Sequence, residues 1–99
     1  MKITEYNPDD LIALAALAAD RANTCYDTER YRTSDIQMHV LFDDLGLDYG
    51  IIMHYRAGLV SPKTNKWIIL ADAMNSPQEA LELLNDLLLE AAEKTFKIN

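Results

Sequence analysis

The first run of helically spaced hydrophobic residues follows Asn7. Asn is a good N-cap, Pro8 suits the first turn of a helix, and Asp9 and Asp10 meet the positive end of the helix dipole. We predict a helix from about Pro8 to Thr24, whose many alanines would permit close approach of a neighbouring element. Its expected buried stripe is Leu11, Leu14, Ala15, Ala18 and Ala22, with Leu17 off the stripe.

A second helix is predicted over the next hydrophobic segment. Residues 33–35 offer a helix cap, and Gly46 is a typical residue after a helix end, so we expect a helix to about Leu45. In this helix Ile36 and Val40 lie nearly opposite the main apolar face, so we expect contacts on two sides. The main face is Met38, Leu41, Phe42 and Leu45.

Two runs rich in Ile, Tyr, Trp and Val, residues 50–60 and 66–72, predict an antiparallel β-hairpin. Residues 61–65 between them have turn chemistry. If Val60 faces Lys66, alternate residues divide between two faces of the sheet. The face expected in the core carries Met53, Tyr55, Leu59, Trp67 and Ile69, and the opposite face carries His54, Arg56, Ile68 and Leu70.

The strongest local signal lies near the C-terminus. Ser76 and Glu79 have the spacing of a capping box, and Pro77 occupies the first helical position, so we predict a helix to about Phe96. Its expected buried stripe is Ala80, Leu84, Leu87, Leu88 and Ala91.

These elements predict one α+β domain over residues 1–99. It has two N-terminal helices, an antiparallel β-hairpin and a C-terminal amphipathic helix, and residues 1–6 are a candidate third strand. A chain of 99 residues, 49% hydrophobic and 25% charged, fits a single globular domain.

Net charge indicates which class of partner to expect, and cysteine content indicates the cellular compartment. Sixteen Asp and Glu against nine Lys and Arg give a net charge of −7, which disfavours nucleic acid and anionic membranes and favours basic partners. The lone cysteine, Cys25, and the lack of a long apolar run indicate a reducing interior. We therefore expect a cytoplasmic protein that binds neither nucleic acid nor membrane.

Two groups of acidic residues are the candidate partner-binding surface. Five carboxylates of the last predicted helix fall within a narrow arc opposite its leucines, where like charges three or four residues apart destabilise the helix. Three more lie around the end of the second predicted helix, where negative charge gains nothing from the dipole. The simpler interpretation of both groups is a solvated surface. The groups are Glu79, Glu82, Asp86, Glu90 and Glu93, and Asp43, Asp44 and Asp48.

A metal site is one alternative that the sequence leaves open. His39 and Asp43 lie one helical turn apart, and His54 of the hairpin would complete a two-histidine, one-carboxylate set. The structural alternative is that His54 is hydrogen-bonded to Asp72, its expected neighbour across the hairpin.

An anion site is a second alternative. Arg21, Arg30 and Arg32 gather in one segment ahead of a predicted helix start, although neighbouring carboxylates are available to pair with them. A nucleophilic role for Cys25 is rejected, because no catalytic motif surrounds it.

We therefore expect no enzymatic activity and no cofactor. The leading interpretation is a small acidic module that inhibits or neutralises a basic partner protein, similar in charge and size alone to nuclease immunity proteins, antitoxins and phage-encoded inhibitors. A small anion- or metal-dependent enzyme or ligand-binding domain and a self-assembling subunit remain alternatives. We also expect a homodimer, formed through the second sheet face or the side of Ile36 and Val40.

Overall fold

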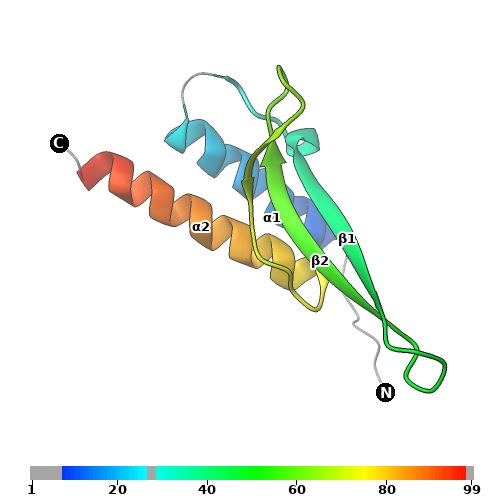
Figure 1. The fold of residues 1–99 in the computed structure, drawn as a ribbon. Coiled ribbons are helices and arrows are strands. Elements are labelled where there is room, and N and C mark those ends of the chain that lie inside the picture. The colour runs from blue at the N-terminus through cyan, green and yellow to red at the C-terminus, as the bar shows by residue number, and fades with distance from the viewer. Residues whose placement is uncertain (1–7, 27–28, 98–99) are drawn as a thin grey trace.

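One antiparallel sheet and two helices make up the fold. The computed structural model describes residues 8–26 and 29–97, with side chains described as far as residue 94. The strands are paired in the order β1-β2-β3, and both helices lie on one face of the sheet (Figure 1). The α+β class is confirmed. The elements are α1 (Pro8–Cys25), the short 3-10 helix η1 (Thr33–Asp35), β1 (Ile36–Asp44), β2 (Ile51–Val60), β3 (Trp67–Leu70) and α2 (Pro77–Lys97).

The first and last predicted helices are confirmed as α1 and α2. The predicted cap at Asn7 and the candidate strand at residues 1–6 lie outside the described residues. At the start of α2, the backbone N–H of Glu79 donates to Ser76 Oγ at 3.1 Å, and the Ser76 hydroxyl donates to Glu79 Oε1 at 3.1 Å. The local capping signal therefore sets where α2 begins.

The second predicted helix is wrong, because residues 36–44 form strand β1 instead. This segment has apolar residues at both helical and alternate spacing, and alternation prevails because β2 supplies a partner along its whole length. Ile36 and Met38 pack against the helices, while Gln37, which lies between them in the sequence, is exposed on the other face of the strand. Residues 33–35, predicted as a helix cap, form the single turn η1. There the N–H of Arg32 donates to Asp35 Oδ2 at 2.9 Å.

The β2–β3 hairpin is confirmed, but its expected register is not. Val60 pairs with Trp67 rather than Lys66, and an irregularity between Leu59 and Val60 shifts the register. Trp67 was expected on the core face, yet it lies over Gly58, on the face opposite the buried side chain of Leu59. The bulge therefore moves Trp67 out of the core.

Small residues let the two helices approach closely. Ala18 and Ala22 of α1 are fully buried and belong to one core cluster with Leu84 and Leu88 of α2. The expected buried faces of both helices are thus confirmed at their centres, while Leu17 and Leu89 are exposed, as their off-stripe positions predict.

One buried polar residue fixes how α1 and α2 are aligned. The side-chain amide of Asn85 is buried and donates to the backbone oxygens of Leu14 and Leu81, both at 3.0 Å. A second hydrogen bond joins the helices in the opposite direction, from Arg21 Nη1 of α1 to the backbone oxygen of Asn85 at 3.0 Å. Because each buried polar atom has a partner, this contact joins the helices in one register.

Candidate functional site

The five acidic residues predicted on the last helix form one exposed row on α2. Each of Glu79, Glu82, Asp86, Glu90 and Glu93 is exposed, and the row spans about 21 Å at the helical rise of 1.5 Å per residue. Within the described residues none of the five forms an ion pair; Glu79 and Glu82 accept hydrogen bonds from Ser76 and Gln78. We call this surface the α2 acidic row.

The distal part of the β1–β2 hairpin projects beyond both helices (Figure 1). The backbones of Tyr55 and Met74 exchange two hydrogen bonds of 2.8 Å, and beyond this bridge β1 is the only described strand that lies beside β2. We call residues 41–54 the arm. It exposes large apolar side chains, with Phe42 65%, Tyr49 78% and Ile51 64% exposed and Leu47 fully exposed. Such a concentration on a projection is typical of a surface that binds protein.

Backbone hydrogen bonds hold the arm tip in a defined turn. The N–H of Leu45 donates to Gly50 O at 2.9 Å, and the N–H of Gly50 donates to Gly46 O at 2.9 Å. Gly46 and Gly50 both have positive φ, 101° and 79°, which favours glycine. The N–H of Gly46 also donates to Asp44 Oδ1 at 2.9 Å. The exposed apolar side chains therefore sit on an ordered turn.

The second acidic group lies on this arm rather than at a helix end. Asp44 stabilises the tip turn, and Asp43 Oδ2 lies 3.0 Å from His54 Nε2. Asp48 is exposed in the turn itself. Since β1 is not a helix, the dipole argument made from the sequence does not apply here, and two of the three carboxylates have local partners.

The candidate metal set is only partly brought together. His39, Asp43 and His54 lie on the sheet face away from the helices, because β1 pairs Leu41 with His54. The expected pairing of His54 with Asp72 is wrong; Asp43 is its partner. No cluster of three or more His, Cys, Asp or Glu suited to a metal ion occurs among the described residues. The structure therefore brings Asp43 and His54 together but does not join His39 to them as a metal site.

The three arginines of the candidate anion site have separate environments. Arg21 contacts Asn85 of α2, whereas Arg30 and Arg32 are exposed in the segment before β1. The carboxylate of Glu29, in the same segment, accepts hydrogen bonds from Ser61 Oγ at 2.8 and 3.0 Å instead of pairing with an arginine. The cluster is therefore not assembled around one point.

Cys25 is a structural residue in this fold. Its Sγ donates to the backbone oxygen of Leu88 at 3.1 Å, and burial raises the pKa of its thiol. We expect Cys25 to react with a thiol reagent at mildly alkaline pH more slowly in the native protein than in the urea-unfolded chain, because less thiolate is present. The reaction rate with and without urea measures this. Equal rates would show that the thiol is freely accessible and not held by Leu88.

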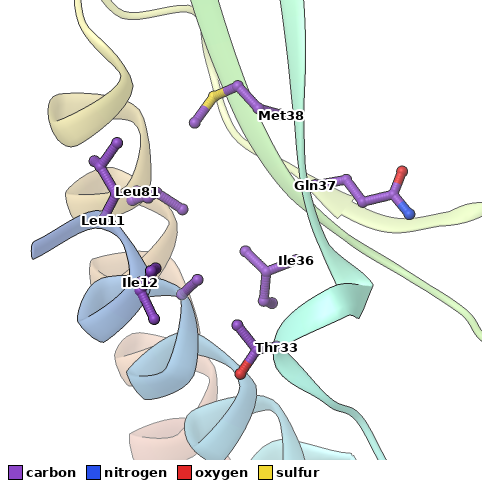
Figure 2. A pocket seen from close by; sticks show the side chains of 8 residues that line it. Leu11, Ile12, Thr33, Ile36, Gln37, Met38 and Leu81 are labelled. Carbon is purple, nitrogen blue, oxygen red and sulfur yellow. The ribbon is translucent and has the colours of Figure 1, made fainter. Parts of the chain in front are cut away.

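A shallow apolar groove lies between α1, η1 and β1. It has a volume of about 290 Å³ and is lined by Leu11, Ile12, Ala15, Thr33, Ile36, Gln37, Met38 and Leu81. Figure 2 shows Ile36 and Met38 pointing into the groove and Gln37 pointing to the other side of β1. The groove has no charged lining residue, so it suits apolar side chains rather than an ionic substrate.

Sequence reasoning did not identify the arm or this groove. Both depend on β1, which the sequence predicted as a helix. The overlooked signal is the alternation of Ile36, Met38, Val40 and Phe42, followed by a Gly-containing turn with Leu47 and Tyr49.

Comparison of the chain with protein-family models, with curated proteins and with solved structures gives no match to any of them. Among the described residues no helix combines the length and apolar character needed to cross a membrane.

Proposed function

We propose that this chain is a cytoplasmic protein-binding module without enzymatic activity, which covers a basic surface of a partner protein with the α2 acidic row. The observation that carries the proposal is the row itself, in which five exposed carboxylates remain without an ion pair among the described residues. The four like-charge pairs along it, each three or four residues apart, cost the helix about 0.2–0.5 kcal/mol apiece. Glu79 caps the start of α2, but the other four carboxylates give the helix no such stabilisation. A basic partner protein, by contrast, would be attracted by the whole row.

Other features support binding rather than chemistry. The groove is apolar, the thiol of Cys25 is held by Leu88, and the arginines do not converge. Steric and electrostatic occlusion needs no reacting group, and an acidic surface would also speed encounter with a basic protein. The acidic residues of the arm contribute less to the proposed partner surface, because Asp43 and Asp44 already have partners within the chain.

Neutralising the centre of the row should weaken partner binding without destabilising the fold. In the triple variant Glu82→Gln, Asp86→Asn, Glu90→Gln, we expect about tenfold weaker binding at low salt, from about 0.5 kcal/mol per charge. The melting temperature should stay or rise, because like-charge repulsion is relieved. Basic proteins captured from host extract by wild type would be identified and purified, and their Kd for each variant measured against salt concentration.

The matched control removes three acids elsewhere. Asp10→Asn, Asp20→Asn, Asp72→Asn makes the same change in net charge at exposed positions off the row. It should bind like wild type. Equal weakening by both variants would mean that only net charge matters, and unchanged binding by the row variant would exclude the α2 acidic row as the contact surface.

A further inference from the structure

The outer edge of β1 is a feature that the proposed function leaves unused. β1 is nine residues long and lies at the edge of the sheet, and no other described strand pairs with its outer side. It contains neither Pro nor Lys, residues that commonly block pairing at an edge. A long edge of this kind is a template for another strand.

We propose that two copies of this chain pair through their β1 edges, antiparallel about a two-fold axis at Val40, so that the arm of each copy packs on the groove of the other. This inference goes beyond the proposed function, because the α2 acidic row takes no part in the contact. The pairing would form a six-stranded sheet with the helices of both copies on one face.

The position of the axis follows from overlap along β1. Pairing all nine residues places Ile36 opposite Asp44 of the second copy and Val40 opposite itself. Residues directly opposite each other in antiparallel strands share a face, so Met38 meets Phe42 of the second copy on the helix side. The apolar side chains that line the groove on one copy are therefore continued by Phe42 of the other copy.

The two exposed apolar surfaces of the chain lie at opposite ends of β1. The groove is at Ile36, and the arm tip begins after Asp44, about 26 Å away at 3.3 Å per residue. Antiparallel pairing places the groove end of one copy beside the arm end of the other. It brings Phe42 of one copy, 65% exposed, beside Met38 at the groove of the other, so that apolar surface is buried at both ends of the contact.

Charge along this edge favours a second copy over an unrelated partner. Acidic residues lie at the distal end of β1, and the exposed Arg30 and Arg32 precede its other end. If the register is continued past the strands, Asp48 of one copy comes level with Arg32 of the other. Two carboxylates also precede β1, but Glu29 is bonded to Ser61 and Asp35 is buried against the Arg32 N–H. The exposed side chains at the two ends of β1 therefore have opposite charges, which favours a two-fold contact.

The open sheet face is the weaker candidate for self-association. It carries His39, Arg56 and the Asp43–His54 pair, so its centre is polar. The sequence predicted a contact through the Ile36 and Val40 side of a helix. The contact proposed here uses instead the backbone edge of the strand that contains both residues.

Solution mass tests the contact. We expect a dimer, twice the 11.2 kDa of one chain, by sedimentation at several concentrations. Val40→Lys should raise the dimer Kd about tenfold or more, because two like charges meet at the axis, while circular dichroism still shows the native fold. Leu89→Lys adds the same charge to an exposed position on α2 and should leave the dimer intact. A monomer at every concentration, or a dimer unaffected by Val40→Lys, would overturn the proposal.

Cross-linking tests the register and does not depend on how Val40→Lys folds. In a Cys25→Ser background, Val40→Cys should form an intersubunit disulfide on mild oxidation, because facing strand residues lie about 4.5–5.5 Å apart. Gln37→Cys is the control on the same strand, since its two copies would lie about 20 Å apart. Failure of Val40→Cys to cross-link, or preferential cross-linking of Gln37→Cys, would rule out this pairing.

Discussion

Truncating Leu84 or Leu88 to alanine is expected to remove a large part of the stability of this protein. Both side chains are fully buried, in the part of α2 that packs on α1 and β2. Each substitution should lower the free energy of unfolding by about 2–5 kcal/mol, from lost apolar burial and the cavity left behind. Small domains have only about 5–15 kcal/mol in total. Urea denaturation at one fixed protein concentration measures the change.

The control for this experiment lies on the same helix. Leu89 is the next residue to Leu88 but is 41% exposed, so Leu89→Ala should change the free energy of unfolding by about 0.5 kcal/mol or less. A near-neutral effect of both Leu84→Ala and Leu88→Ala would mean that the buried face of α2 is assigned wrongly. A fixed concentration matters because self-association would add to the apparent stability.

Elements with local signals were predictable from the sequence. The Ser76–Glu79 capping box and the leucine spacing after it define α2 within the chain itself, and residues 8–10 do the same for α1. These signals need no knowledge of what packs against the helix. The buried positions Leu84 and Leu88 followed for the same reason.

Strand β1 was not predictable in the same way. Its apolar residues satisfy helical spacing through Met38, Leu41 and Phe42 and strand spacing through Met38, Val40 and Phe42. What decides between them is pairing with β2, a contact between residues far apart in the chain. The two opposite apolar faces on the predicted helix argued against that prediction. In a strand, Ile36, Met38, Val40 and Phe42 all lie on one face.

The features of the candidate site also differ in whether local sequence could predict them. Exposure of the α2 acidic row followed from helical spacing alone, whereas the partner of His54 depended on β1. Once residues 36–44 form a strand, Asp43 becomes the diagonal neighbour of His54, so Asp72 was the wrong choice. The register of Trp67 failed because a bulge cannot be inferred from alternation.

The bulge also makes Gly58 a position where a methyl group should be harmful. A Cβ at residue 58 would lie 2.6 Å from Cε3 and Cζ3 of Trp67 and 2.7 Å from the backbone oxygen of Ile69. The Trp67 ring can turn away, but the Ile69 oxygen belongs to β3, which pairs with β2 beside Gly58. The strands themselves would therefore have to shift.

We expect Gly58→Ala to lower the free energy of unfolding by about 1–3 kcal/mol, as overpacking in a closely packed region does. The sign is diagnostic, because replacing glycine by alanine in an unobstructed strand is stabilising by roughly 0.5–1 kcal/mol. Urea denaturation of Gly58→Ala, Trp67→Ala and the double variant separates the two contacts. In the Trp67→Ala background the ring contact is gone, so Gly58→Ala should cost less but remain destabilising through Ile69. A stabilising effect of Gly58→Ala in the wild-type background would show that neither Trp67 nor β3 lies against this residue.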